Sequence, residues 1–461
     1  METMQLSHLL YGVAVLVGLL CAYSTWRTWF SSLHVESSTT GYRLSFLLLI
    51  LSLASKVVVL QRRSDLTALY TEGLSTQNRV QVVLALCALA WSAFLIVTGR
   101  VRVSSLLAGS SFWMTMLIVV FGVTAIWSVW PALTLYRTTE LAVFWIVSIH
   151  LFSHPRWFVR LEGLLWALLC LYWLNGLVSP GANTFGQSGL LAAMRSNGGT
   201  TIAAILFLWS IFQLSGKNWL NASMKLILSA LSIVVFGSFA SAIALACALF
   251  VAVFLSTSRS PRPAIVSLVA MSAVISIQIG LLSSGEALSA LRSATFELGA
   301  MFGKSTAALT SATGRFGLWA ELWEVSKLQP WGFGFAAAER LFGADATLLG
   351  WAPGPGGAHN GYLSAWFGAG WGGFMALGAL LVSLCMKGVR VAPSILPLYA
   401  GVLTLIAINN MTIPLIGGAL NPVLVVVMAF TSAPLVIAFA RNEPQHRGYD
   451  YRLRHQRTIR A

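Results

Sequence analysis

The sequence predicts an all-α polytopic membrane protein with about 12 to 13 transmembrane helices and one large extracytoplasmic loop before the last three helices. Three observations predict this fold class. Of the 461 residues, 57% are hydrophobic and only 9% are charged, whereas a soluble domain carries roughly 25% charged residues. Apolar runs of about 18 residues recur along the chain, each long enough to cross about 30 Å of hydrocarbon. Basic residues gather in the short connections between these runs.

The apolar runs are expected to be helices, because backbone amides in lipid must pair within their own segment. The run at 139–153 is short, and the stretch 221–256 can be divided in more than one way. The runs fall at 8–25, 43–60, 80–98, 110–130, 139–153, 161–178, 200–215, 221–237, 239–256, 264–283, 361–385, 395–410 and 416–440.

The formal net charge of +15 raises nucleic-acid binding as a possible function, but the positions of the charges favour another explanation. They follow the positive-inside rule for cytoplasmic loops, and they also suit contact with anionic membrane lipids. We therefore predict no nucleic-acid partner. The clusters are Arg100 and Arg102, Arg156 and Arg160, Lys217 and Lys225, Arg259 and Arg262, Lys387 and Arg390, and six arginines of the tail from Arg441 to Arg460.

Placing these clusters inside divides the chain into four parts. Residues 1–283 form N-terminal transmembrane helices, 284–360 the large outer loop, 361–440 C-terminal transmembrane helices and 441–461 a basic cytoplasmic tail. The connection 178–200 then also lies outside. Arg62, Arg63 and Arg79 lie outside as well, against the rule, so the orientation of the N-terminal helices is the least determined part of this topology.

The outer loop contains a segment with helical periodicity, Arg315–Leu328. Leu318, Leu322 and Val325 recur at helical spacing, which predicts an amphipathic helix at the membrane interface, a place that suits Trp319 and Trp323. Pro330 ends this helix, and the Gly/Pro-rich stretch 350–357 leads back to the membrane.

Charged residues inside the apolar runs are scarce. No Asp or Glu is expected in the middle of a span, and Glu140 and Glu162 are placed at helix ends. Ion-coupled transporters usually need an intramembrane carboxylate, so this pattern disfavours a transporter. Lys56, late in the second run, is expected to extend its amine to the interface.

The outer loop also holds the residues best suited to chemistry. Arg315 could bind an anionic group through its bidentate guanidinium, and His359 has the side chain best suited to proton transfer near neutral pH. No His, Asp or Glu cluster has metal-ligand spacing, so we expect neither a metal nor another cofactor. A lone histidine at a helix start is more often structural than catalytic, so these residues alone indicate little.

The order of the motifs resembles the carboxy-terminal signature of the O-antigen ligase and polymerase superfamily. The resemblance covers about 60 residues, roughly 314–373, and is closest to the exopolysaccharide polymerase branch of the succinoglycan type. The residues that carry it are Gly314, Arg315 and Trp319; Pro330, Gly332 and Gly334; His359, Asn360 and Leu363; and Gly368, Gly370, Gly372 and Gly373.

The sequence departs from the family pattern in one place. The stretch Arg195–Gly199 fits the upstream arginine and Gly/Asn-rich segment of the family. The family's Ser-Arg pair before the large loop has no counterpart, because Ser238–Ala242 contains no arginine. Either Arg195 or another basic residue then replaces it, or the helix is aligned differently.

The resemblance implies glycosyl transfer from an undecaprenyl-pyrophosphate-linked oligosaccharide, without a nucleotide sugar or a metal. It implies that Arg315 and Arg195 hold the pyrophosphate while His359 activates the acceptor hydroxyl. Trp319 and Asn360 are expected to contact the substrate, with Trp319 stacking on a sugar face. An interfacial tryptophan needs no ligand to explain it.

Three functions remain open within this interpretation. The first is a polymerase that joins exopolysaccharide or O-antigen repeat units, with chain-length and export proteins as partners. The second is a ligase that transfers finished glycan to lipid A-core. The third, from another class, is a flippase or exporter of lipid-linked glycan. The polymerase and the ligase would both work in the bacterial inner membrane with the active site facing the periplasm.

Overall fold

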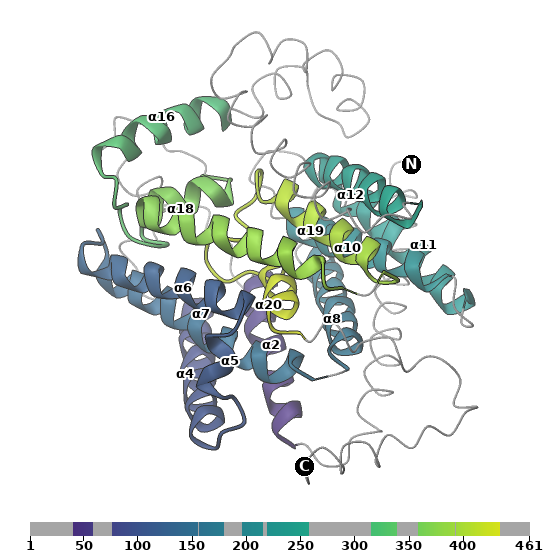
Figure 1. Cartoon of the computed structure of the whole chain (residues 1–461), viewed down its shortest axis with the longest axis horizontal. Coiled ribbons are helices and arrows are strands. Elements are labelled where there is room, and N and C mark those ends of the chain that lie inside the picture. The colour runs from purple at the N-terminus through teal and green to yellow at the C-terminus, as the bar shows by residue number, and fades with distance from the viewer. Residues whose placement is uncertain are drawn as a thin grey trace, which may run out of the picture.

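The computed structural model describes residues 40–58, 76–154, 156–178, 196–214, 219–257, 315–338, 358–391 and 393–433 (Figure 1). These residues form helices and connections and contain no strand. The helices are α2 (Thr40–Val57), α4 (Thr76–Val97), α5 (Val103–Leu106), α6 (Ser110–Val123), the short 3-10 helix η1 (Thr124–Ile126), α7 (Pro131–Phe152), α8 (Trp157–Val178), α10 (Asn197–Gln213), α11 (Trp219–Phe236), α12 (Phe239–Thr257), α16 (Arg315–Leu328), α18 (Gly361–Gly388), α19 (Leu396–Asn409) and α20 (Leu424–Ser432).

The described helices include five that are long and apolar enough to cross a membrane. They are Asn78–Val97, Pro131–Phe152, Trp157–Gly176, Trp219–Phe236 and Gly361–Gly388. Shorter apolar helices pack among them, and every apolar run predicted within the described residues contains a helix. The predicted fold class, an all-α polytopic membrane protein, is confirmed. The predicted runs at 8–25 and 264–283 lie outside the described residues.

Helix termini gather at two ends of the bundle. At one, which we call the basic end, the Arg160 guanidinium lies 4.3 Å from the Tyr42 ring centroid. At the same end Lys387 Nζ donates to the Phe430 carbonyl over 2.7 Å. The opposite end, which we call the His359 end, holds the starts of α10, α12 and α18 and the close of α19.

The interior is built from large apolar side chains. Five tryptophans with almost no exposed surface lie in it: Trp145, Trp157, Trp166, Trp173 and Trp209. The helix pairs in the most extensive contact are α12 with α19, α10 with α11 and α18 with α6. In Figure 1, α16 runs beside the first half of α18, whose other side meets α6.

Three helices depart from the predicted runs. α7 begins at Pro131, before the run predicted at 139–153, and the added residues include polar side chains. The run predicted at 416–440 is wrong in its first part, because residues 411–423 are irregular and α20 starts only at Leu424. α18 is broken at Ala369 and Gly370, where the backbone leaves helical geometry.

α16, the helix predicted within the large loop, has the predicted bounds, Arg315–Leu328. Its buried face carries Trp319, Leu322 and Ser326, while Trp323 is exposed. α18 starts at Gly361, directly after the predicted end of the loop. The described residues do not include the tail 441–461 or most of the loop, so the division of the chain into four parts stays a prediction.

Candidate functional site

His359 forms a tight turn immediately before α18. Its backbone φ is +49°, a left-handed conformation that is uncommon for a residue with a side chain. The next residue, Asn360, caps the helix, because its Oδ1 accepts hydrogen bonds from the amides of Tyr362 (3.0 Å) and Leu363 (3.1 Å). Ala358 and Asn360 are buried and His359 is half-buried, so the turn is fixed on both sides of the imidazole.

The start of α18 is attached to the end of α19. The Gly361 amide donates to the Asn410 carbonyl over 2.7 Å, and Asn410 Oδ1 accepts from the Ile416 amide over 2.7 Å. A Cβ on Gly361 would overlap the Asn410 side chain. The close approach of these two segments therefore requires a glycine directly after the Asn360 cap.

Two further helices start at the same end. Ser196 caps α10, its Oγ accepting from the Gly199 amide over 3.1 Å, and its own amide donates to the Phe236 carbonyl over 3.1 Å. After a turn at Gly237, with φ of +53°, Ser238 precedes α12 and accepts from the Ser241 amide over 3.4 Å. The starts of α10 and α12 therefore lie side by side.

Asn409 joins these helix starts to the His359 turn. Its Nδ2 donates to Thr201 Oγ1 over 3.2 Å, and Thr201 Oγ1 lies 3.3 Å from Ser241 Oγ. Thr201 is in the first turn and a half of α10, and the residue after Asn409 holds Gly361. We call Thr201, Ser241, Asn409 and Asn410, all buried, the terminus cluster. Asn409 Oδ1 is buried and has no hydrogen-bond partner within the described part of the chain.

The predicted site residues divide into those the structure places and those it does not. Asn360 is the α18 cap described above. Trp319 is buried, and its indole Nε1 donates to the Ala358 carbonyl over 2.8 Å. Arg315 is the first residue of α16, and only its backbone is described. Arg195 lies outside the described residues, directly before the α10 cap Ser196. Their catalytic and binding roles, and that of His359, stay predictions.

The Pro-Trp-Gly-Phe-Gly motif at 330–334 has a structural place. The amides of Phe333 and Gly334 donate to the carbonyls of Phe367 (2.9 Å) and Gly368 (2.8 Å). Trp371 N donates to the Pro330 carbonyl over 3.1 Å. The motif thus pairs with the backbone of α18 across its break. Its opposite side meets the corner between η1 and α7, where the Val129 amide donates to Phe333 over 3.0 Å.

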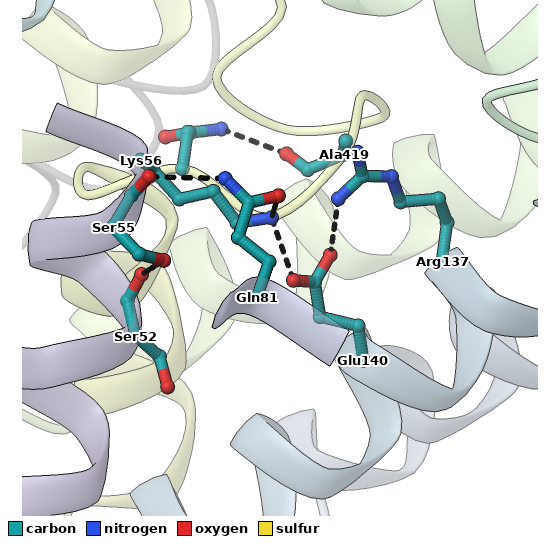
Figure 2. A network of polar contacts seen from close by, with 8 residues as sticks. Ser52, Ser55, Lys56, Gln81, Arg137, Glu140 and Ala419 are labelled. Carbon is teal, nitrogen blue, oxygen red and sulfur yellow. Dashed lines mark hydrogen bonds and ion pairs between the residues drawn. The ribbon is translucent and has the colours of Figure 1, made fainter. Parts of the chain in front are cut away.

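A buried charged network joins α2, α4 and α7 (Figure 2). Glu140 accepts from Lys56 Nζ over 2.6 Å and from Arg137 Nη1 over 2.9 Å, and Lys56 also donates to Gln81 over 3.0 Å. Gln81 in turn donates to the Ser55 carbonyl over 3.0 Å. The two cations share one carboxylate, so these three side chains carry one net positive charge inside the bundle.

This network corrects two expectations. Lys56 does not reach out to the interface, because Glu140 and Gln81 hold its amine within the protein. Glu140 is not at a helix end, because α7 starts nine residues before it at Pro131. By contrast, Glu162 lies in the second turn of α8 near the basic end, where it pairs with Lys225 Nζ over 2.5 Å. Both carboxylates are neutralised by partners, as buried charges generally are.

The terminus cluster was missed from the sequence. Asn409 and Asn410 close an apolar run, and a pair of amides at that place was the available signal. Thr201 and Ser241 gave no signal, because small hydroxyl residues are common in membrane helices and bond to their own backbone. Within Ser238–Ala242, the stretch compared with the family's Ser-Arg pair, Ser241 lies beside Thr201 of α10 and donates to Ser238 Oγ.

Among the described residues, no three His, Cys, Asp or Glu side chains gather where they could hold a metal ion. Metal-independent chemistry stays a prediction.

Residues 224–378 match the family model described as O-antigen ligase. The match covers about a third of the chain, from α11 into the second half of α18, and includes the whole block 314–373. No curated protein and no solved structure matches the chain. The matched residues contain the His359 turn, the 330–334 motif and Ser241, so the family domain overlaps the site, whereas Thr201, Asn409 and Asn410 lie outside the match. The chain therefore carries, at residues 224–378, a domain of the O-antigen ligase family, a membrane glycosyltransferase-type domain, and this match supports the resemblance to the O-antigen ligase and polymerase superfamily.

Proposed function

We propose that this protein transfers a glycan from an undecaprenyl-pyrophosphate-linked oligosaccharide to a glycan acceptor, and that it polymerises exopolysaccharide or O-antigen repeat units. The observation that carries the proposal is the meeting of the family's His359 turn with the starts of α10 and α12 through the terminus cluster. Glycosyl transfer needs a base beside a site for the leaving diphosphate, and a histidine at the same end of the bundle as two helix N-termini supports the proposal.

The diphosphate would bind where α10 and α12 begin. Helix N-termini carry unpaired amides and a partial positive charge, and so favour phosphate groups. Arg195 directly precedes the α10 cap, and Arg315 opens α16. A guanidinium can bind a phosphate through two parallel hydrogen bonds. This chain has no arginine near Ser241, where the family pattern has one. The two helix starts would then supply part of the stabilisation that this arginine gives in other members of the family.

The reaction is a displacement at the anomeric carbon of the donor. The acceptor hydroxyl oxygen forms the new C–O bond while His359 accepts its proton. The bond between the anomeric carbon and the pyrophosphate oxygen breaks, and undecaprenyl pyrophosphate leaves with the electron pair. Arg315 and Arg195 stabilise the charge that develops on the leaving group. The proton on His359 then passes to solvent or to the released diphosphate, which returns the base to its starting state.

The orientation follows from the two ends of the bundle. Arg100, Arg160 and Lys387 lie at the basic end, which by the positive-inside rule faces the cytoplasm. The His359 end would then face the periplasm, where lipid-linked glycans are assembled after export. We accordingly place the protein in the bacterial inner membrane.

The alternatives are a ligase that acts on lipid A-core and an exporter of lipid-linked glycan. An ion-coupled exporter would need a carboxylate free to bind a proton or sodium. Glu140 lies within a membrane helix, but it is held by both Lys56 and Arg137. This pairing favours an enzyme over a coupled exporter. Polymerase and ligase share the same chemistry, so their acceptors distinguish them.

The test uses purified full-length protein with lipid-linked repeat units, a chelator, no ATP and no ion gradient. A ladder of longer lipid-linked chains is the expected result, and it should disappear for His359→Ala. A single transfer that requires lipid A-core would establish the ligase instead. Transport of intact donor across a vesicle membrane without any covalent product would establish the exporter.

A further inference from the structure

The His359 turn has a backbone conformation that needs outside support. A φ of +49° is disfavoured for a residue with a Cβ, because the Cβ comes too close to the following carbonyl oxygen. Such conformations persist only where surrounding contacts determine them, and they concentrate at functional sites. The Asn360 cap and the Gly361–Asn410 bond fix the chain after His359. The chain before it needs a separate contact.

Trp319 provides that contact. Its indole Nε1 donates to the Ala358 carbonyl over 2.8 Å, the carbonyl of the peptide bond that enters His359. Both residues are buried, so the bond is shielded from competing water. The indole itself packs in an apolar cluster with Leu322, Leu363 and Phe367. The tryptophan therefore fixes one end of the peptide unit whose other end is the His359 amide.

α16 is itself held firmly at its far end. Gln329 Nε2 donates to the Gly332 carbonyl over 2.9 Å, immediately before the residues that pair with Phe367 and Gly368 of α18. Trp127 of the η1–α7 corner donates to the same carbonyl over 3.1 Å. The helix that carries Trp319 is thus anchored by the 330–334 motif to two membrane helices, and its position relative to α18 is defined.

We propose that Trp319 is a positioning residue for His359. Its N–H holds the Ala358 carbonyl, which sets the left-handed turn and so the place of the imidazole relative to the donor and acceptor. The proposal rests on the proposed glycosyl transfer with His359 as base. It gives Trp319 a role other than stacking on a sugar, which suits its burial in an apolar cluster.

α16 carries both Trp319 and Arg315, the arginine expected to bind the diphosphate. Position 315 is four residues before Trp319, so the two positions lie on one face of α16, a single turn apart. The helix whose indole contacts the His359 turn thus also carries the arginine expected to bind the diphosphate. α16 would set the spacing between the base and the leaving group.

The test compares two tryptophans of the same apolar cluster. Trp319→Phe removes the N–H donor and part of the ring. Trp366→Phe is the matched control, because Trp366 is equally buried and its Nε1 has no hydrogen-bond partner within the described residues. A third variant carries 3-benzothienylalanine at 319, which keeps the bicyclic shape and lacks the N–H. Thermal melting in detergent would show that each variant is folded.

Misplacing a catalytic group by about 1 Å can cost on the order of 100-fold in rate. We expect Trp319→Phe and the benzothienyl variant to lower kcat by about 10- to 100-fold, with the KM for lipid-linked donor changed less than about 3-fold. Trp366→Phe should stay within about 3-fold of wild type in both constants. In a His359→Ala background Trp319→Phe should cause almost no further loss, because a residue that acts through the base has nothing left to position.

Several outcomes would overturn the proposal. A raised KM with unchanged kcat, additive with His359→Ala, would show that Trp319 binds a sugar directly. Equal losses in the Trp319 and Trp366 variants would show a packing role alone. A wild-type protein that makes no glycosidic product refutes the proposed function itself. If instead wild type is active, His359→Ala is inactive and Trp319→Phe equals wild type, only the positioning role fails.

Discussion

Gly370 lies at the break of α18, and replacing it with alanine should destabilise the fold far more than the same change elsewhere in that helix. Its φ of +59° and ψ of −154° belong to a region that almost only glycine occupies. A Cβ there would overlap the Pro330 carbonyl oxygen and come within 2.5 Å of the Trp331 carbonyl carbon. The side chain and the 330–334 motif cannot share this space, so one of them must move.

The magnitude follows from what that movement breaks. Backbone strain at such a position costs on the order of 1–3 kcal/mol. Displacing Pro330 also breaks the bond from Trp371 N to the Pro330 carbonyl, 3.1 Å long, and each lost bond of this kind costs about 0.5–1.5 kcal/mol. The neighbouring bonds of Phe333 and Gly334 would weaken with it. A total of about 3–5 kcal/mol is expected, a large share of the 5–15 kcal/mol typical of folded proteins.

The assay is thermal melting of detergent-solubilised protein, followed by size-exclusion chromatography, with Gly378→Ala as the matched control. Gly378 lies in the same helix, and a Cβ there would meet nothing within 4 Å. Alanine is the better helix former, by about 1 kcal/mol, so this control should be neutral or slightly stabilised. Gly370→Ala should melt several degrees lower or fail to accumulate in folded form. Equal melting temperatures for the two variants would refute the account of the α18 break.

Three further predictions follow from the same structure. His359→Ala should lower the rate of glycosyl transfer by about 10²–10⁴-fold at normal expression, and Arg315→Lys, which keeps the charge and loses the bidentate geometry, should be strongly impaired in donor handling; steady-state kinetics with lipid-linked donor measures both. Substantial activity in the histidine variant would leave that residue as a structural turn. Glu140→Gln leaves two buried cations without their carboxylate, so a loss of about 3–5 kcal/mol should appear as a lower melting temperature, and unchanged melting would show that the network is solvated. A cysteine replacing the exposed Glu324 should react with a membrane-impermeant thiol reagent in intact spheroplasts and one at the exposed Val389 should not, whereas the reverse labelling would place His359 in the cytoplasm.

The helices were predictable because their signal is local. A run of about 18 apolar residues has no other stable conformation in lipid, so α8 and α11 appear close to their predicted positions. α16 was also predictable to its bounds from its helical periodicity and Pro330. The polar first half of α7 could not be recognised by hydropathy. Its Arg137 and Glu140 are tolerated because Lys56, from another helix, completes their pairing.

The site was only partly predictable, for a related reason. The motif order predicts His359, Asn360 and Trp319 as site residues, but spacing along the chain does not show which groups meet. Asn360 is occupied by capping α18, and the indole of Trp319 is directed to the Ala358 carbonyl. The contact of Asn409 with Thr201 joins residues 208 positions apart. Such contacts depend on how the helices pack, and no local pattern encodes them.

The places where the local rules fail lie at or next to the site. α19 has 14 residues and rises about 21 Å, which is short of the roughly 30 Å of hydrocarbon. We infer that the irregular chain that follows, with Leu415, Ile416 and Leu420 buried, lies within the depth of the membrane. Non-helical backbone at that depth is stable only inside protein or along a watery cavity, because its amides find no partners in lipid. Here Asn410 Oδ1 accepts from the Ile416 amide, and Gly361 binds the Asn410 carbonyl.

The break in α18 is satisfied in the same way, by the backbone of residues 330–334. Both irregular segments contact α18. Asn410, where one of them begins, accepts a hydrogen bond from the amide of Gly361, the residue directly after the Asn360 cap. A bundle made only of continuous helices would present apolar side chains at that position. Interrupting two helices brings backbone amides, carbonyls and asparagine side chains to the depth of the bundle, where a polar diphosphate and a sugar hydroxyl could be accommodated. The irregular backbone therefore supplies the polar groups that the proposed glycosyl transfer would need at this end of an otherwise apolar bundle.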